Sequence, residues 1–432
     1  MIGFDTKAEY LKNGLRGTFL ILPLKADGEM DIRSVTFADA TEIGFDSESM
    51  SDLIRHKCAR AQGFVRRFRL PSHDLRIDYE DGFSIPISDT QIAVFGNGIA
   101  FLIVYFYVAE ADISRVYAFV NPGYIHSRDQ AIQQQFINRL RREVLSGSGF
   151  DFYVEGENKD LAIKEAYLLN AAFVDCRFEE LALLDKTTFL AHKLISLSAD
   201  FEDASEMDIA YTYGARDVEN KTFRWGCCIS SQSISFVYGP SNNNYDGSGQ
   251  CAIRPSAEMS VEDMLLTAED DLLLTVLALY QKHTCMFLNE ELYRQMKEGG
   301  GSRKVIQKIK RAALMFKAYE TLPPSQISRW NNVCETYRHL LKLNGVTEAL
   351  SEIGDNIELI NDEQEKITEE RRNFFGTIIA VFGMISIIAA VLQIVDYVGP
   401  GDPMMLRWMI ISCAGIAALG VAWIIMMLGR KR

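Results

Sequence analysis

The chain has 432 residues, of which 45 are basic and 58 acidic, and its formal net charge is −13. The residues before position 373 carry 41 basic and 56 acidic side chains, and this acidic excess argues against direct binding of nucleic acid. The eight cysteines include no Cys-x-x-Cys pair and the six histidines show no metal-binding spacing. The sequence therefore favours free thiols and identifies no metal site.

The first predicted elements are strands. One strand is expected over residues 17–24, and a hairpin is expected over residues 91–108. Gly96-Asn97-Gly98 separates two apolar runs in this hairpin, and Asn-Gly in that position is a strong turn signal. The second arm is apolar on both faces, which is typical of a central strand covered from two sides.

Residues 64–70 combine apolar and basic side chains and are expected to form an exposed strand. Its Arg66, Arg67 and Arg69 are either solvated side chains or an anion site. The remaining elements before residue 261 are predicted from periodicity and length. Strands are expected at 116–120, 209–213, 221–228 and 233–238, helices at 129–145, 158–174 and 178–195, and a polar loop at 239–249.

Residues 261–372 are predicted to be helical, with helices over 261–296 and 304–319 and a third from 325 into a long stalk. The stalk carries apolar residues at steps of three and four, which is the pattern of a coiled-coil seam. The seam consists of Val346, Leu350, Ile353, Ile357, Ile360, Ile367 and Phe374, with Gln364 and Arg371 in the same row.

Two uncharged apolar runs follow, residues 374–395 and 408–428, with 22 and 21 residues. Each is long enough to cross a hydrocarbon core about 30 Å thick. Residues 396–403 are rich in turn formers, so residues 373–432 are predicted to be a two-helix transmembrane hairpin. Because basic residues precede the first run and follow the second, we expect both termini on the cytoplasmic side of the inner membrane.

These elements predict three domains: an α+β ligand-sensing domain (1–260), a helical region and stalk (261–372) and the hairpin (373–432). A single hairpin encloses no water, but a ring of copies could form a pore. The first run would then line it through one largely apolar stripe, which can close by dewetting. The stripe consists of Asn373, Thr377, Ala380, Met384, Ile387 and Val391. The alternative is that these residues only pack the hairpin together.

Charged and polar residues outside the apolar runs suggest two further sites. Asp396 and Asp402 would form rings that attract cations at the outer mouth of an oligomeric pore. Arg224 and Trp225, with Asn242 and Asn243, could hold a phosphate and a base; the alternative is that they are ordinary strand and loop residues. No catalytic motif is present, and Gly96-x-Gly98 lacks the third glycine of a dinucleotide fingerprint.

An α+β cytoplasmic domain, a long helical stalk and a C-terminal two-helix hairpin with a basic tail resemble the CorA family of divalent-cation channels. The resemblance implies a homopentamer in which the first span lines the pore. The Gly-Met-Asn signature of that family, which holds hydrated magnesium, is missing. The chain has Gly383-Met384-Ile385 in mid-span and Tyr397-Val398-Gly399-Pro400 where the signature would stand.

The chain is also similar to divergent CorA-like proteins that accompany type III CRISPR systems. That resemblance implies a membrane effector in antiviral defence, gated by a nucleotide second messenger such as a conjugate of S-adenosylmethionine and AMP. Two alternatives remain open. One is a CorA-like transporter of Mg²⁺ or another divalent cation, and the other is a cytoplasmic enzyme that the hairpin tethers to the membrane.

Overall fold

The computed structural model describes residues 15–28, 31–71, 75–79, 81–108, 127–154, 165–174, 178–196, 209–214, 223, 225–239, 261–297, 303–398, 404, 407–408, 410–412, 415 and 420. The chain divides into two units, Met1–Ile353 and Gly354–Arg432. The helices from residue 261 to residue 343 therefore belong with the sheet in the first unit.

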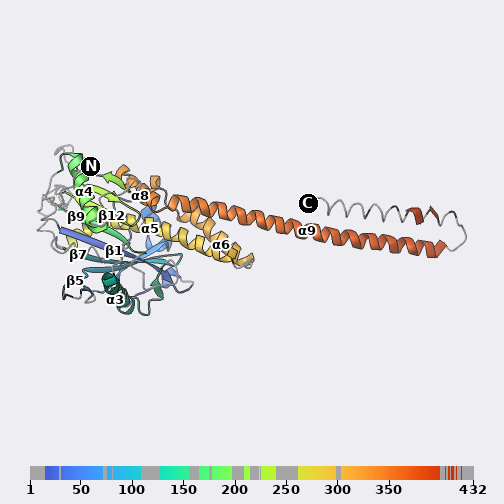
Figure 1. Cartoon of the computed structure of the whole chain (residues 1–432), viewed down its shortest axis with the longest axis horizontal. Coiled ribbons are helices and arrows are strands. Elements are labelled where there is room, and N and C mark those ends of the chain that lie inside the picture. The colour runs from blue at the N-terminus through green and yellow to red at the C-terminus, as the bar shows by residue number, and fades with distance from the viewer. Residues whose placement is uncertain are drawn as a thin grey trace. The chain divides into compact units, whose positions relative to one another are not determined.

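The described part of the first unit is built on a ten-stranded sheet (Figure 1). Its neighbouring strands are antiparallel except β12 and β9, which are parallel. The strand order is β10 (Ala210–Tyr213), β11 (Trp225–Ile229), β12 (Ser233–Tyr238), β9 (Tyr167–Phe173), β1 (Leu15–Ala26), β7 (Ile99–Val108), β6 (Asp89–Phe95), β3 (Val65–Arg69) and β2 (Thr41–Ile43). β8 (Phe150–Phe152) pairs with the end of β1, and β4 (Arg76–Asp78) pairs with β5 (Ser84–Pro86) in a separate sheet.

Helices cover both faces of the large sheet. On β9, Leu168 packs with α3 (Ser127–Glu143) and Ala172 packs with α4 (Leu181–Ser196). These two strand residues are four apart and share a face, so α3 and α4 lie on the same side. The opposite face meets α5 (Val261–Lys297), where Tyr280 stacks on Phe95 of β6 with ring centroids 4.1 Å apart, and α8 (Asn331–Leu343), which packs on α5.

The predicted hairpin at residues 91–108 is confirmed as β6 and β7. Gly98 adopts a positive φ of 87°, a conformation that glycine takes without a steric penalty, and Ile99 N donates a hydrogen bond to Asn97 Oδ1. β7 lies between β1 and β6, and its residues from Ile99 to Phe106 are buried. The expectation of a central, doubly covered strand is therefore also confirmed.

The helix predicted over residues 158–174 is wrong where the structure describes it, because Tyr167–Phe173 forms strand β9. This strand is buried along its whole length between β1 and β12. A strand buried on both faces shows no alternation of polar and apolar residues, so its sequence does not differ from that of a buried helix. The partner strands, which are distant in sequence, decide the conformation. The strand predicted at 116–120 and the loop at 239–249 lie in stretches that are almost entirely outside the described residues.

The predicted helix from residue 325 into the stalk is in fact three helices. α7 (Pro324–Ile327) follows α6 (Arg303–Met315) and a π-helical turn at Phe316–Glu320. α8 ends at Asn344 and Gly345, whose φ of 65° is the left-handed conformation typical of a helix C-terminus. α9 (Val346–Val398) then runs for 53 residues without interruption.

The second unit contains most of α9. Residues Arg372–Gln393 of this helix have a mean hydropathy of 2.5, and none of this segment is buried. Among the described residues it is the one helix that is long and apolar enough, by length and composition, to cross a membrane. Most of the second predicted span (408–428) lies outside the described residues, although its positions 408, 410–412, 415 and 420 are helical.

Candidate functional site

The predicted pore-lining residues all lie on α9, and the structure divides them by exposure. Asn373, Thr377 and Ile387 are exposed, whereas Ala380, Met384 and Val391 are half-buried. The half-buried residues are separated by four and seven positions, so they lie on one face of the helix. Another part of the same chain therefore partly covers the predicted stripe.

Gly420, in the second apolar run, lies against this face of α9 at Met384. A Cβ atom added at Gly420 would overlap Sδ of Met384, so the two residues are in direct contact within the second unit. In the described part of the second unit, the opposite face of α9 is exposed. At 100° per residue, its positions lie roughly 140–180° from Met384. The exposed residues of this face are Phe375, Ile379, Phe382, Ser386, Ala389 and Gln393.

The other sequence-predicted site residues are only partly described. Asp396 lies in the last turn of α9, but its side chain is outside the described part, as are Asp402, Arg224, Asn242 and Asn243. Trp225 begins β11 and is half-buried. Its ring lies 5.8 Å from that of Phe236 and directly over Gly214, where a Cβ would come within 2.8 Å of it. The Trp225 ring thus packs between neighbouring strand residues.

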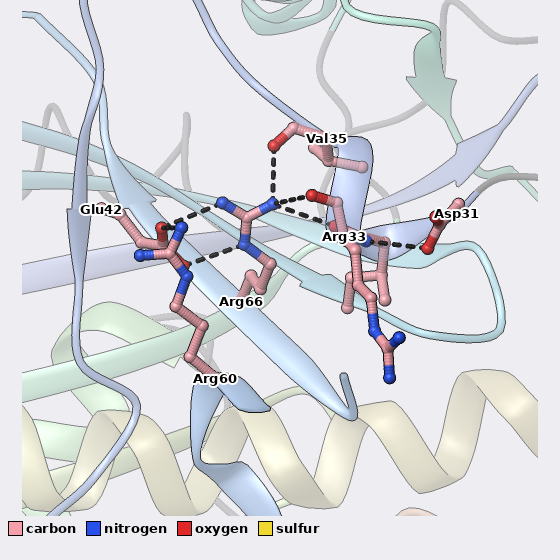
Figure 2. Close-up of polar contacts among 7 residues, drawn as sticks. Asp31, Arg33, Val35, Glu42, Arg60 and Arg66 are labelled. Carbon is pink, nitrogen blue, oxygen red and sulfur yellow. Dashed lines mark hydrogen bonds and ion pairs between the residues drawn. The ribbon is translucent and has the colours of Figure 1, made fainter. Parts of the chain in front are cut away.

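The prediction that β3 is an exposed strand is wrong, because Arg66 is only 6% exposed. Figure 2 shows its guanidinium group between the Glu42 carboxylate and a turn at Ile32–Ser34. Arg66 donates to both Glu42 oxygens at 2.9 Å and to the carbonyl oxygens of Ile32, Arg33 and Val35 at 2.8–3.1 Å. These hydrogen bonds hold the pKa of Glu42 below its usual value.

Arg67 is buried still more deeply, with 1% exposure, and donates to Gln91 of β6 and to Glu269 of α5. Arg69 is half-exposed and pairs with Asp89 at 3.2 Å. Each arginine of β3 therefore has a carboxylate partner. Their partners lie from 20 to more than 200 positions away in the sequence, so the local pattern of alternation could not reveal them.

One pocket lies beside β3 and has a volume of about 390 Å³. Its lining contains four arginines and three carboxylates: Arg55, Arg60, Arg66 and Arg67, with Glu42, Asp46 and Asp52. Because Arg66 and Arg67 serve as internal cross-links, little net positive charge is left for a ligand. Cys58 also lines the pocket, but burial raises the pKa of its thiol to about 12, so it is a poor nucleophile.

Another pocket, which we call the α3 pocket, lies between α3 and β4 and has a volume of about 550 Å³. Its lining contains three guanidinium groups, three side-chain amides and one carboxylate. These are Arg76, Arg139 and Arg142, then Gln134, Gln135 and Asn138, and Asp78. Arg139 bonds Asp78 at 3.3 Å and Glu143 at 3.2 Å, and Arg142 also bonds Glu143.

The chemistry of the α3 pocket suits an anion with hydrogen-bonding groups. Guanidinium groups donate in pairs to phosphate or carboxylate oxygens, and side-chain amides both donate and accept. The hydrogen bond from Arg142 lowers the pKa of Glu143, which lies next to the pocket. Sequence reasoning missed this pocket. The available signal was the polar, arginine-rich face of the predicted helix at 129–145.

A buried polar network crosses the sheet on the side of α4. Asn170 accepts from Thr18 at 3.2 Å and donates to Ser235 at 3.1 Å, and Ser235 lies 3.0 Å from Nδ1 of His192. Serine and histidine at this distance can form a nucleophile and base pair. However, Ser235 and His192 are both 0% exposed, and burial lowers the pKa of His192 to about 3. No substrate can reach this pair in the folded domain, so its role is structural.

Among the described residues, no group of histidine, cysteine, aspartate or glutamate side chains is arranged to hold a metal ion. No family model, curated protein sequence or solved structure matches the chain.

Proposed function

We propose that the chain is a homo-oligomeric, CorA-like membrane channel whose cytoplasmic domain binds a small ligand and gates a cation pathway. The observation that carries the proposal is the continuity of α9. One helix begins at Val346 beside a glycine turn, is buried in the first unit at Val346 and Ile353, and ends in a segment of membrane-spanning length. A domain movement that displaces the start of α9 would be transmitted along a helix with no internal break.

The face of α9 opposite Met384 is the one we assign to the pore. The contact between Met384 and Gly420 supports a hairpin in which the later segment covers the Ala380–Met384–Val391 stripe. In a ring of copies, the uncovered face of α9 would be free to face the central axis and line the pore. It carries Phe375 and Phe382, which are 61% and 65% exposed, and rings of phenylalanine can close a pore by dewetting.

The test compares two substitutions on opposite faces of α9. Phe382→Asn should wet the constriction and depolarise cells in the absence of any signal, while Met384→Asn should not. Leu392→Asn, at an exposed position between the two faces, is the matched control. Membrane potential is read with a voltage-sensitive dye in cells that express equal amounts of each variant.

The outcomes separate the alternatives. Depolarisation only in cells with Met384→Asn would mean that the pore is lined by the stripe predicted from sequence. If neither variant leaks, and wild type is also silent under its activating signal, the hairpin is an anchor and a tethered enzyme is the better hypothesis. Growth of a magnesium-uptake-deficient strain on low magnesium would favour the transporter instead.

The α3 pocket is the proposed site of the gating ligand, because its lining combines three guanidinium groups with three side-chain amides. A nucleotide messenger in antiviral defence fits this chemistry. We expect a conjugate of S-adenosylmethionine and AMP to bind the purified chain in calorimetry and Arg142→Glu to abolish the binding. Arg142 is 76% exposed, so this change should not unfold the domain; Arg338→Glu, on exposed Arg338 of α8, is the control. Equal binding by both variants would exclude this pocket.

A further inference from the structure

α6 and the π-helical turn after it form a basic segment in an acidic protein. Residues 303–320 contain one acidic side chain, Glu320, and six basic ones: Arg303, Lys304, Lys308, Lys310, Arg311 and Lys317. The residues before position 373 carry an excess of acidic side chains overall. The segment is therefore a local concentration of positive charge whose sign is opposite to that of the domain around it.

The packing of α6 shows which face is available. Ile309, Ala313 and Phe316 are buried, at 6%, 1% and 2% exposure, and α6 packs against α5. Spacings of four and three place these residues on one face. The other side is exposed at Gln307, Lys308, Arg311, Leu314, Met315 and Lys317.

Large apolar side chains are exposed among these basic residues. Leu314 is 51% exposed, Met315 46%, and Tyr319 in the π-helical turn 67%. Basic side chains mixed with exposed leucine, methionine and aromatic residues are typical of helices that lie in the interface of a bilayer. The basic groups attract anionic headgroups, and the apolar side chains enter the boundary with the acyl chains.

We propose that this face of α6, with the turn at Phe316–Glu320, binds an anionic lipid surface. The occupant is the headgroup layer of the bilayer to which the chain is attached, and charge complementarity argues for it. Nucleic acid is disfavoured because it offers no acyl layer to the exposed side chains of Leu314, Met315 and Tyr319. A second copy of the chain would bring the same positive charge against α6. The inference rests on the proposed function only in taking the chain to be membrane-bound.

The experiment places a photo-crosslinking amino acid, benzoylphenylalanine, at single positions of the full chain in lipid nanodiscs. Met315 tests the proposal, Leu53 on α1 (Asp52–Cys58) is an exposed apolar control at 58%, and Phe382 reports insertion of α9. The nanodiscs contain either phosphatidylcholine alone or a mixture with phosphatidylglycerol. Covalent lipid adducts are counted by mass spectrometry.

We expect adducts at Phe382 in both kinds of nanodisc, at Met315 only with phosphatidylglycerol, and at Leu53 in neither. Each basic residue near an anionic surface changes binding about fivefold, so Lys308→Glu with Arg311→Glu should reduce the Met315 adduct by more than that and leave the Phe382 adduct unchanged. Salt at about 1 M, where the Debye length is about 3 Å, should also reduce it.

Lipid adducts at Phe382 but not at Met315 would overturn the inference and leave the proposed channel intact. Adducts at Met315 that do not depend on phosphatidylglycerol, or adducts to a second copy of the chain, would also overturn it. Absence of adducts at Phe382 would instead show that α9 does not enter the bilayer, which contradicts the proposed function itself.

Discussion

The side chain of Arg66 ties a turn, a strand and a carboxylate together. Replacing it with methionine leaves the carbonyl oxygens of Ile32, Arg33 and Val35 without their donor and deprives Glu42 of its buried partner. Removing one member of a buried ion pair costs about 3–5 kcal/mol. We expect Arg66→Met to lower the melting temperature of the detergent-solubilised protein markedly. Arg60→Met removes an exposed arginine from the same Glu42 and should have a small effect; similar losses in both would contradict this role.

Asp271 of α5 is half-buried beside the Tyr238 hydroxyl, and burial raises its pKa to about 7. The folded protein therefore retains a proton that the unfolded chain releases near 3.8, the ordinary pKa of an aspartate. The free energy of unfolding should consequently fall as pH rises from the unfolded pKa to the folded pKa of Asp271. Above pH 7 the carboxylate is charged in both states, and the loss of stability is complete. Asp271→Asn should flatten this decline in a series of melting curves. Asp46→Asn, at an exposed carboxylate, should leave the slope unchanged.

Residue-level patterns in the sequence identified the turn at Gly96-Asn97-Gly98 because its chemistry is local. The same patterns gave a wrong prediction for the arginines of β3, because the partners of these arginines are distant in the sequence. Several arginines in one strand indicate exposure to solvent only if no carboxylate pairs with them, and Glu269 of α5 pairs with Arg67 from 202 positions away. The α3 pocket was missed similarly, because Arg76 and Arg142 come from elements that meet only in the folded chain.

At the scale of elements, the contact between Met384 and Gly420 offers a matched test. Gly420→Leu forces a side chain into Met384, whereas a Cβ at Gly415 meets nothing within 4 Å. Overpacking typically costs about 1–3 kcal/mol. We expect Gly420→Leu to lower the melting temperature in detergent and Gly415→Leu to leave it unchanged. Met384→Ala combined with Gly420→Leu should recover part of the loss, and no recovery would argue against the contact.

Because α9 is continuous, we expect it to transmit a movement of the first unit to the membrane-spanning segment of the proposed channel. Proline inside a helix costs about 3 kcal/mol or more and kinks it. Ile360→Pro should therefore abolish the membrane-potential response to the activating signal while ligand still binds, and Ile360→Ala should retain both. A normal electrical response in the proline variant would mean that the signal does not travel along α9.

Element types were predictable where periodicity and length agreed, as for α3, α4, α5 and the hairpin. β9 was not predictable, because a strand buried on both faces loses the alternation that identifies it. The predicted coiled-coil seam is not available along its whole length for contact with another copy of the chain. Val346 and Ile353 of that seam are buried within the first unit, at 1% and 2% exposure, so part of it serves the chain's own domain.

For the whole molecule, the distribution of basic residues around the apolar runs predicts that both termini are cytoplasmic. A cysteine at Gly401 should react with a membrane-impermeant maleimide in intact cells, and one at Lys431 only after the cells are opened. The reverse pattern would place the first unit outside the cell and contradict its proposed role in sensing a cytoplasmic ligand.

Among the described residues of the first unit, four cysteines are buried: Cys58 in α1, Cys227 and Cys228 in β11, and Cys285 in α5. Burial raises the pKa of every one of these thiols, and alkylating reagents attack the thiolate. The native domain therefore contains chemically silent positions that become reactive only when the surrounding element opens. These cysteines lie in three different elements. The order in which an alkylating reagent modifies them would therefore show which element unfolds first.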